Sequence, residues 1–274
     1  MGAELNQNKF MRTKRNFQRS VVAALLAVVS CATASVTTNV YATEITVLAA
    51  GAAKEFVARI DAPFTLATGY RIKATFDTVG AQRELVEKGE RPDAVILSAA
   101  AMVQLDKLGL IDAATIRDVG DVQVGLAVSA GDAEKSAPDI STHEALTRTL
   151  LAAKSIAYAD PARGATAGAH FAKVLTALSI QERVAGKVTV LPFGVEVIEA
   201  VAAGKFEIGV SQSSEIVQHK GVRYLGALPA PHRLATRYQI AALKDRPLGA
   251  SLAEFVVTEA GKVARRESGF ELRK

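Results

Sequence analysis

The chain has 274 residues, of which 49% are hydrophobic and 22% charged, with only 8 prolines. This composition is ordinary for a globular protein and argues against intrinsic disorder, and the length suffices for two modest domains. The first 42 residues hold five of the 33 basic residues and one of the 28 acidic residues, which leaves 28 basic and 27 acidic residues in the rest of the chain. So small an imbalance gives no basis for nucleic-acid binding, which needs a clustered basic surface.

The first 42 residues have the pattern of a cleavable Sec signal peptide. Four basic residues between 12 and 19 precede an apolar run at 21–29 that is too short to span a bilayer. Val40-Tyr41-Ala42 then gives a small-x-small cleavage site. We therefore expect translation from Met11, cleavage after Ala42 and export to the periplasm.

Cys31 is the only cysteine and lies inside this leader. The mature chain would then have no disulfide and no thiol chemistry. As an alternative, residues 28–31 form a poor lipobox that would make Cys31 a lipidated N-terminus.

From Thr43 onward, short apolar strands alternate with amphipathic helices. This alternation predicts an α/β fold with a mixed, mostly parallel sheet and helices on both faces. The expected strands cover residues 45–50, 71–76, 94–97, 122–129, 155–159, 188–191, 206–210, 222–225 and 238–243. The expected helices cover residues 52–66, 81–88, 98–108, 113–117, 144–153, 166–178, 195–203, 214–219, 249–258 and 260–266.

The chain is expected to form two lobes. The long strand at 122–129 leads into the polar stretch 130–142, after which the alternation of strands and helices begins again. Lobe 1 would comprise residues 43–123 plus 235–274, and lobe 2 residues 124–234. Two crossing segments, near Val122 and Arg233, would join the lobes and allow hinge closure.

Five expected strand-to-helix junctions carry small or polar residues at the helix start. In open α/β sheets, ligands bind where such helix N-termini converge, and each N-terminus contributes about 0.3–1 kcal/mol toward an anion. The pattern therefore favours a small anionic ligand. Since every parallel sheet has such loops, the spacing alone leaves open how many face a site. The junctions are Gly51 with Ala52, Val79 with Gly80, Thr166 with Ala167, Gly194 with Val195, and Gln212 with Ser213.

Four charged or titratable side chains lie close to these junctions. Lys54 opens the first helix, Arg83 lies one turn into the second, and Arg163 and His170 flank Thr166. Arginine forks match carboxylates. Lys54 and Arg83 also fit a solvated helix face, and His170 fits an exposed residue, a ligand-binding group or a general base.

Metal and hydrolase chemistry find no support in the sequence. The four histidines have no metal-ligand spacing, and neither a Walker A motif nor a G-x-S-x-G motif occurs. We expect no metal site and no cofactor.

Five segments resemble the periplasmic molybdate-binding protein family, the solute-binding subunits of ABC uptake systems with a two-lobed type II fold. The resemblance covers essentially the whole chain after the leader. It implies a small anion bound between the lobes, an ABC permease as partner and a monomeric state. The segments are ITVLAAGAA at 45–53, TFDTVGAQRELVEKGERPDAVILSAAAM at 75–102, DPARGATAGAHFAKVL at 160–175, GVEVIEAVAAGKFEIGVSQSSEI at 194–216 and Gly269-Phe270.

Some contact positions of that family are retained and others are replaced. The family's alanine loop matches Ala165 to Gly168, and its valine at a helix start matches Val195. Its first serine is replaced by Ala52. The serine of a serine-rich turn, here Asp77-Thr78-Val79-Gly80, is replaced by Val79. Its tyrosine is replaced by Gln212.

The missing hydroxyls count against molybdate as the ligand. Tetrahedral oxyanions are held by neutral hydroxyls and backbone N–H groups, whereas Arg163 and His170 suit a flexible organic polycarboxylate. The same family includes aconitate isomerases, secreted enzymes that interconvert trans- and cis-aconitate. That reaction needs a base and cations, and the resemblance suggests His170 as base with Arg163, Arg83 and Lys54 as carboxylate partners. Solute binding for uptake and isomerisation therefore both stay open.

Overall fold

The computed structural model describes residues 43–132 and 137–273. The expected start at Met11, the cleavage after Ala42 and the lipobox at Cys31 lie outside the described residues. Within these two ranges, no helix is both long enough and apolar enough to cross a membrane.

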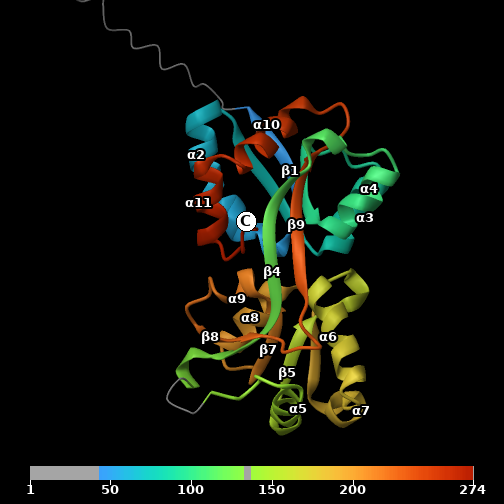
Figure 1. The fold of residues 1–274 in the computed structure, drawn as a ribbon, viewed down its shortest axis with the longest axis vertical. Helices are drawn as coiled ribbons and strands as arrows, with labels where there is room; N and C mark the ends of the chain where they lie inside the picture. The colour runs from blue at the N-terminus through green and yellow to red at the C-terminus, as the bar shows by residue number, and fades with distance from the viewer. Residues whose placement is uncertain (1–42, 133–136, 274) are drawn as a thin grey trace, which may run out of the picture. The chain divides into compact units, whose positions relative to one another are not determined.

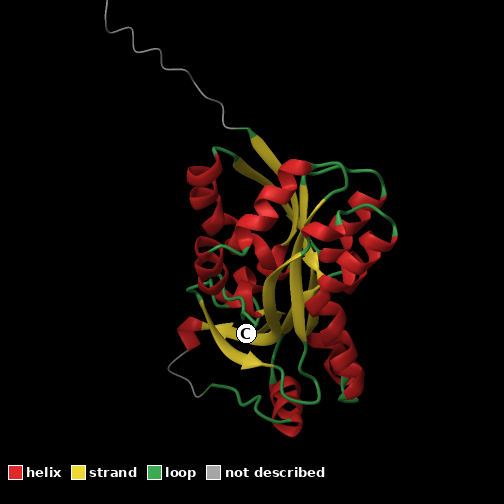
Figure 2. Cartoon of the chain, turned by 45° about the horizontal axis from the view of Figure 1, so that its top comes forward, coloured by secondary structure: helices red, strands yellow, loops and turns green. Residues whose placement is uncertain are grey.

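Strands and helices alternate along the described chain, as the sequence predicts (Figure 2). The strands are β1 (Glu44–Ala50), β2 (Arg71–Asp77), β3 (Ala94–Ser98), β4 (Arg117–Ser129), β5 (Ile156–Ala159), β6 (Val188–Leu191), β7 (Ile208–Gln212), β8 (Val222–Ala227) and β9 (Ala235–Ala242). The α-helices are α2 (Lys54–Thr68), α3 (Val79–Glu87), α4 (Ala99–Lys107), α5 (His143–Ala152), α6 (Thr166–Ala177), α7 (Gln181–Val184), α8 (Gly194–Ala202), α9 (Ser213–Ile216), α10 (Pro247–Val256) and α11 (Glu259–Glu267). The 3₁₀ turns are η1 (Gly51–Ala53), η2 (Ala113–Thr115), η3 (Ala130–Asp132), η4 (Pro161–Arg163) and η5 (Ala185–Lys187).

The sheet is mixed, and its two outer groups of strands are parallel. The strand order is β2-β1-β3-β9-β4-β7-β5-β6, with β8 paired to β4. Strand β1 pairs parallel with β2 and β3, and β5 pairs parallel with β6 and β7. The pairs that involve β4 or β9 are antiparallel. Parallel pairing therefore holds within each outer group, and β4 and β9 join the groups.

Strand β4 changes partners along its 13 residues. Its first part, up to Gln123, pairs with β9, and its second part, from Val124, pairs with β7 and β8. Figure 1 shows β4 and β9 running side by side, with β1, α3 and α4 around their upper part and β5, β7 and α8 around the lower part of β4. This single strand thus belongs to both halves of the sheet.

The buried apolar side chains form separate cores on the two sides of that change. The first core contains residues of 45–122 and 238–270, among them Phe56 and Phe64. A second core and a smaller third one contain residues between 124 and 228, among them Phe171. Each fully buried large apolar side chain contributes about 1.5–3 kcal/mol. The exact residue limits of the two lobes stay a prediction.

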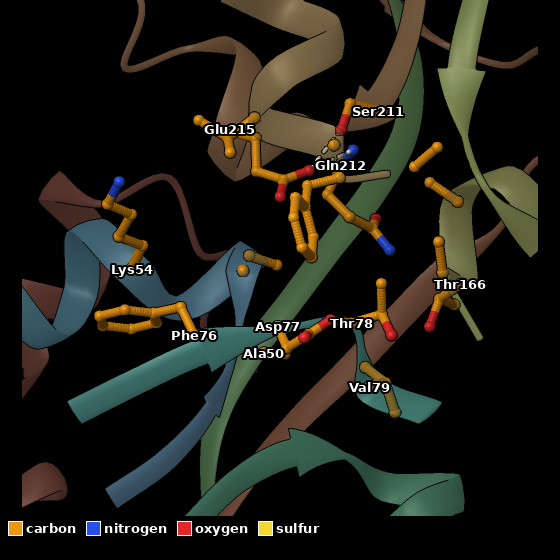
Figure 3. A pocket seen from close by; sticks show the side chains of 18 of the residues that line it. Ala50, Lys54, Phe76, Asp77, Thr78, Val79, Thr166, Ser211, Gln212 and Glu215 are labelled. Atoms are coloured by element: carbon orange, nitrogen blue, oxygen red, sulfur yellow. Dashed lines mark hydrogen bonds between the residues drawn. The ribbon is translucent and has the colours of Figure 1, made fainter. Parts of the chain in front are cut away.

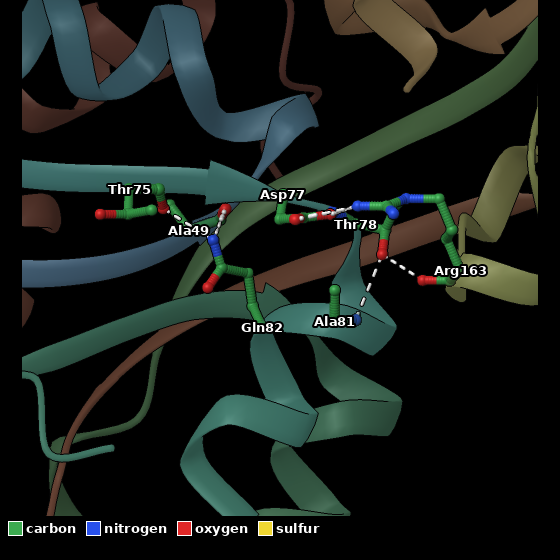
Figure 4. A network of polar contacts seen from close by, with 7 residues as sticks. All are labelled: Ala49, Thr75, Asp77, Thr78, Ala81, Gln82 and Arg163. Atoms are coloured by element: carbon green, nitrogen blue, oxygen red, sulfur yellow. Dashed lines mark hydrogen bonds and ion pairs between the residues drawn. The ribbon is translucent and has the colours of Figure 1, made fainter. Parts of the chain in front are cut away.

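Helix α3 is tied to the sheet by its own polar side chains. The Thr78 hydroxyl accepts a hydrogen bond from the N–H of Ala81 at 3.2 Å, which caps the helix. Gln82 is fully buried and donates to the carbonyls of Ala49 at 3.3 Å and Thr75 at 2.8 Å (Figure 4). These bonds hold the start of α3 at the ends of β1 and β2.

Several expected boundaries were wrong. Strand β4 begins at Arg117 rather than at residue 122, and the helix expected at 113–117 is only the turn η2. Strand β7 continues through Ser211 and Gln212, which were expected in a loop. β7 stays in register with β4 at both residues, with Ser211 opposite Gly125 and Gln212 opposite Val124, so their polar side chains do not end the strand. Helix α9 ends at Ile216 rather than at residue 219.

Gly249 allows α10 to pack closely against the start of β3. A Cβ atom at Gly249 would lie 1.8 Å from the carbonyl oxygen of Asp93. We expect Gly249→Ala to lower the free energy of unfolding by about 1–3 kcal/mol through overpacking. Gly186→Ala is the control, because a Cβ there would meet nothing within 4 Å. Urea unfolding checks this, and equal stabilities of the two variants would contradict it.

Candidate functional site

A pocket of about 180 Å³ lies where strands of both halves of the sheet lead into helices (Figure 3). All five junctions that the sequence singled out contribute to its lining. The lining residues from these junctions are Gly51, Ala52, Val79, Thr166, Ala167, Gly194, Val195 and Gln212. The rest of the lining comprises Ala50, Lys54, Phe76, Asp77, Thr78, Ala159, Ala165, Phe193, Ser211, Glu215 and Tyr238.

Three helices begin at the pocket without a side-chain cap. One of these helices is the continuous run of η1 and α2, in which the N–H of Lys54 already donates to the carbonyl of Gly51. The residues before η1, α6 and α8 are Ala50, Ala165 and Phe193, and none of their side chains accepts a hydrogen bond from the first turn of the helix. The first N–H groups of these helices therefore have no intrahelical acceptor and carry partial positive charge. An anion in the pocket would be a suitable acceptor for them.

Lys54 and Arg163 differ in how they relate to the pocket. Lys54 lines it at the first residue of α2. Arg163 Nη2 lies 3.2 Å from both carboxylate oxygens of Asp77, and its guanidinium stacks 4.8 Å from the ring centroid of Phe193. Arg163 is not among the lining residues, but both of its partners, Asp77 and Phe193, are.

A group of contacts joins the start of α3 to the loop before α6 (Figure 4). The hydroxyl of Thr78 donates to the carbonyl of Arg163, and the N–H of Gly80 donates to the carbonyl of Gly164 at 3.3 Å. A Cβ atom at Gly80 would lie 2.7 Å from the Cα atom of Gly164. Gly80 therefore serves this close approach of two backbones and does not line the pocket.

Glu215 places a carboxyl group inside the pocket. Its Oε2 atom accepts a hydrogen bond from the hydroxyl of Ser211 and lies 3.4 Å from the N–H of Gln212. A Cβ atom at Gly194 would lie 2.3 Å from Oε2, and one at Gly51 would lie 3.1 Å from Oε1. The two glycines therefore make room for the carboxyl. Burial raises its pKa above the usual value, against a smaller opposing effect of the Ser211 hydrogen bond.

Tyr238 brings a phenol from β9 to the same pocket. Only 2% of this residue is exposed, and burial, followed by the charge of Glu215, raises the pKa of its hydroxyl. The side-chain amide of Gln212 donates to the Tyr238 hydroxyl at 3.5 Å. The phenol therefore stays protonated at neutral pH and can donate a hydrogen bond to a ligand.

Arg83, Ser213 and His170 were predicted at the site and lie outside the lining. The Nε of Arg83 is 3.0 Å from the Glu87 carboxylate, so it belongs to the face of α3 that carries this pair. The Ser213 hydroxyl accepts from the N–H of Gln123 at 3.1 Å. These two side chains have partners of their own within the fold.

His170 belongs to a histidine cluster rather than to the pocket. Its Nε2 lies 2.8 Å from the carbonyl oxygen of His232, and His232 Nε2 lies 2.9 Å from His143 Nδ1. The fold thus gathers three histidines that are far apart in the sequence. In the described parts of the chain, no group of three or more potential ligands could hold a metal ion.

Sequence reasoning missed Asp77, Glu215 and Tyr238. Glu215 follows a run of polar residues that we assigned to a loop, and Tyr238 is the polar end of an otherwise apolar strand. Of these three residues, only Glu215 stands in a recognisable local pattern. It ends the Ser-Ser-Glu sequence after β7, and an acid at the third helical position often caps a helix.

Replacing Glu215 by Gln is expected to change how stability depends on pH. Because the folded pKa of Glu215 is raised above 4.5, the unfolded chain ionises first as the pH rises, and the free energy of unfolding falls between 4.5 and the folded pKa. The Glu215→Gln variant has no carboxyl to ionise at this position, so its free energy of unfolding does not fall in this way. Its Tm should therefore rise relative to wild type between pH 4 and pH 7. Exposed Glu90→Gln is the control. A Tm difference for Glu215→Gln that does not vary with pH would contradict the expectation.

The chain has relatives of known family and fold. The family model for bacterial extracellular solute-binding proteins matches residues 45–271. An aconitate isomerase from a Pseudomonas species is 25% identical over 239 residues, which cover 84% of this chain and 88% of that protein.

Two solved structures share the fold. The periplasmic molybdate-binding protein of Azotobacter vinelandii has a TM-score of 0.69 at 14% identity, covering 84% of this chain and 100% of that one. A sulfate-binding protein of Mycobacterium tuberculosis has a TM-score of 0.64 at 19% identity, covering 83% and 86%. These matches confirm the resemblance and the two-lobed α/β fold predicted from the sequence. The chain belongs to the family of bacterial extracellular solute-binding proteins.

Proposed function

We propose that this solute-binding protein binds a small organic carboxylate in the pocket, in the periplasm and as a monomer. Its family is that of solute-binding proteins, which in ABC transporters bind small anions and work with permeases. The observation that carries the proposal is the convergence of three helix N-termini without side-chain caps on one pocket that Lys54 also lines. An ABC permease would be its partner.

The hydroxyl groups of the pocket favour an organic ligand over a tetrahedral oxyanion. The hydroxyls of Thr78 and Ser211 already donate to protein acceptors, and Ala52 and Val79 have none to offer. Of the lining residues, this leaves only Thr166 and Tyr238 to donate a hydroxyl hydrogen to a ligand. Phe76 and Phe193 add apolar ring surface to the lining. A ligand with a carbon skeleton between its carboxylates would use both kinds of surface.

Glu215 also counts against a compact dianion. Two like charges 4 Å apart repel by about 4 kcal/mol at an effective dielectric constant of 20. A ligand whose charges are spread over separate carboxylates can keep them away from Glu215, whereas a single oxyanion in this pocket cannot. The raised pKa of Glu215 further allows its carboxyl to be protonated beside a bound anion.

An aconitate isomerase is the second candidate function. It is supported by the relative of that name and by the presence of two proton-carrying groups, Glu215 and Tyr238, among the lining residues. A protein that only delivers a solute has no need of such groups, whereas an allylic proton shift needs a base and a donor.

Calorimetry with trans-aconitate and with molybdate tests the ligand class. We expect binding of trans-aconitate, and Lys54→Ala should weaken it about tenfold or more, since a hydrogen bond to a charged group contributes about 1.5–3 kcal/mol. Lys88→Ala is the matched control, because Lys88 pairs with Glu84 and does not line the pocket. Tight binding of molybdate with no binding of trans-aconitate would contradict the proposal.

A proton NMR time course with trans-aconitate separates the two functions. Signals of cis-aconitate that grow at a rate proportional to protein concentration would establish the isomerase. Broadened aconitate lines without conversion would support a transport subunit and remove the second candidate.

A further inference from the structure

The lining contains an acid whose surroundings are built around it. Gly194 and Gly51 leave space for the two carboxyl oxygens of Glu215, and a side chain at Gly194 would displace Oε2. Both hydrogen bonds described for the carboxyl, from Ser211 and from the N–H of Gln212, go to Oε2. Figure 3 shows the carboxyl directed toward the middle of the lining residues. Oε1 is therefore the oxygen that is placed to meet a ligand.

Gln212 connects this acid to the phenol of Tyr238. Its backbone N–H faces Glu215 Oε2 at 3.4 Å, and its side-chain amide donates to the Tyr238 hydroxyl at 3.5 Å. Glu215 and Tyr238 therefore reach the pocket from two elements, helix α9 and strand β9, and Gln212 contacts both. The other titratable groups that line the pocket are Lys54 and Asp77.

We infer that Glu215 removes a proton from the bound carboxylate ligand and returns it to another carbon of that ligand, while the hydroxyl of Tyr238 donates a hydrogen bond to the negative charge that forms. This inference rests on the second proposed function. Glu215 would act as the base that the sequence assigned to His170.

The step is balanced on trans-aconitate without a co-reactant. A C–H bond of the methylene group breaks, its proton bonds to a carboxylate oxygen of Glu215, and its electron pair forms a new C=C bond to the central carbon. The electrons of the original double bond move to the former vinylic carbon, with the charge delocalised into the adjacent carboxylate. Glu215 then returns the proton to that carbon. The formula of the ligand is unchanged and the double bond has moved.

A raised pKa suits this role. A carboxylate with a higher pKa is a stronger base, and the group must also give the proton back within the same turnover. Lys54 and the helix N-termini would hold the carboxylates of the ligand, so that the ligand's own charge does not prevent its approach to Glu215.

The test is hydrogen–deuterium exchange on trans-aconitate in D₂O, followed by proton NMR with the full-length protein. Wild-type protein should form cis-aconitate, and deuterium should enter the methylene group to the extent that the proton held by Glu215 exchanges with D₂O before it is returned. Glu215→Gln should slow both processes by 10²-fold or more, and Tyr238→Phe should slow them less, while calorimetry shows that both variants still bind trans-aconitate. Exposed Glu199→Gln on α8 is the matched control and should exchange at the wild-type rate.

The outcomes separate this inference from the binding proposal. Binding of trans-aconitate by wild type with neither conversion nor exchange would overturn the inference and leave the binding proposal standing. The inference would also be overturned if Glu215→Gln exchanged at the wild-type rate, or if His170→Ala lost exchange while Glu215→Gln kept it. No binding by wild type would overturn the proposed function and this inference together. The rate of exchange should rise with pH as the base ionises. If Glu215→Asp shows the same rise displaced to another pH, this would support Glu215 as the titrating base.

Discussion

The backbone N–H groups that lack a side-chain cap at the starts of η1, α6 and α8 are the constraint on which the site depends. A helix cannot satisfy its first N–H groups internally, and in most helices a Ser, Thr, Asp or Asn does so. Here the side chains of Ala50, Ala165 and Phe193 cannot accept these hydrogen bonds, and all three residues line one pocket. The resulting positive potential comes from the backbone, so it persists whatever the pH.

That potential also explains how a buried carboxyl is tolerated. Glu215 lies beside Gly194, the first residue of α8, and accepts hydrogen bonds from Ser211 and Gln212. These donors stabilise the ionised form, whereas burial favours the neutral form and is the larger effect. The balance leaves a carboxyl that can exist in either state. The same scaffold can therefore serve a carrier, which needs only the N–H groups, or an isomerase, which also needs the acid.

The pocket also depends on β4 and β9, the two strands that join the halves of the sheet. β4 pairs with β9 on one side of Val124 and with β7 and β8 on the other. Tyr238 on β9 and Gln212 on β7 meet because both strands flank β4. Contacts between Thr78 and Arg163, and between Gly80 and Gly164, hold the two sides together at the rim.

The sequence alone determined the alternation of strands and helices and the five junctions that line the pocket, because each is a local pattern of apolar spacing and small residues. The family followed from the resemblance of five segments. It did not determine which side chains reach the pocket. His170 and Arg83 lie on helices that begin near it, but side-chain direction along a helix depends on what packs against each face. Glu215 and Tyr238 are distant in sequence, and only the pairing of β4 with β7 and β9 brings them together. Non-local strand pairing leaves no local pattern, so the tertiary structure alone decided where the acid of this pocket lies.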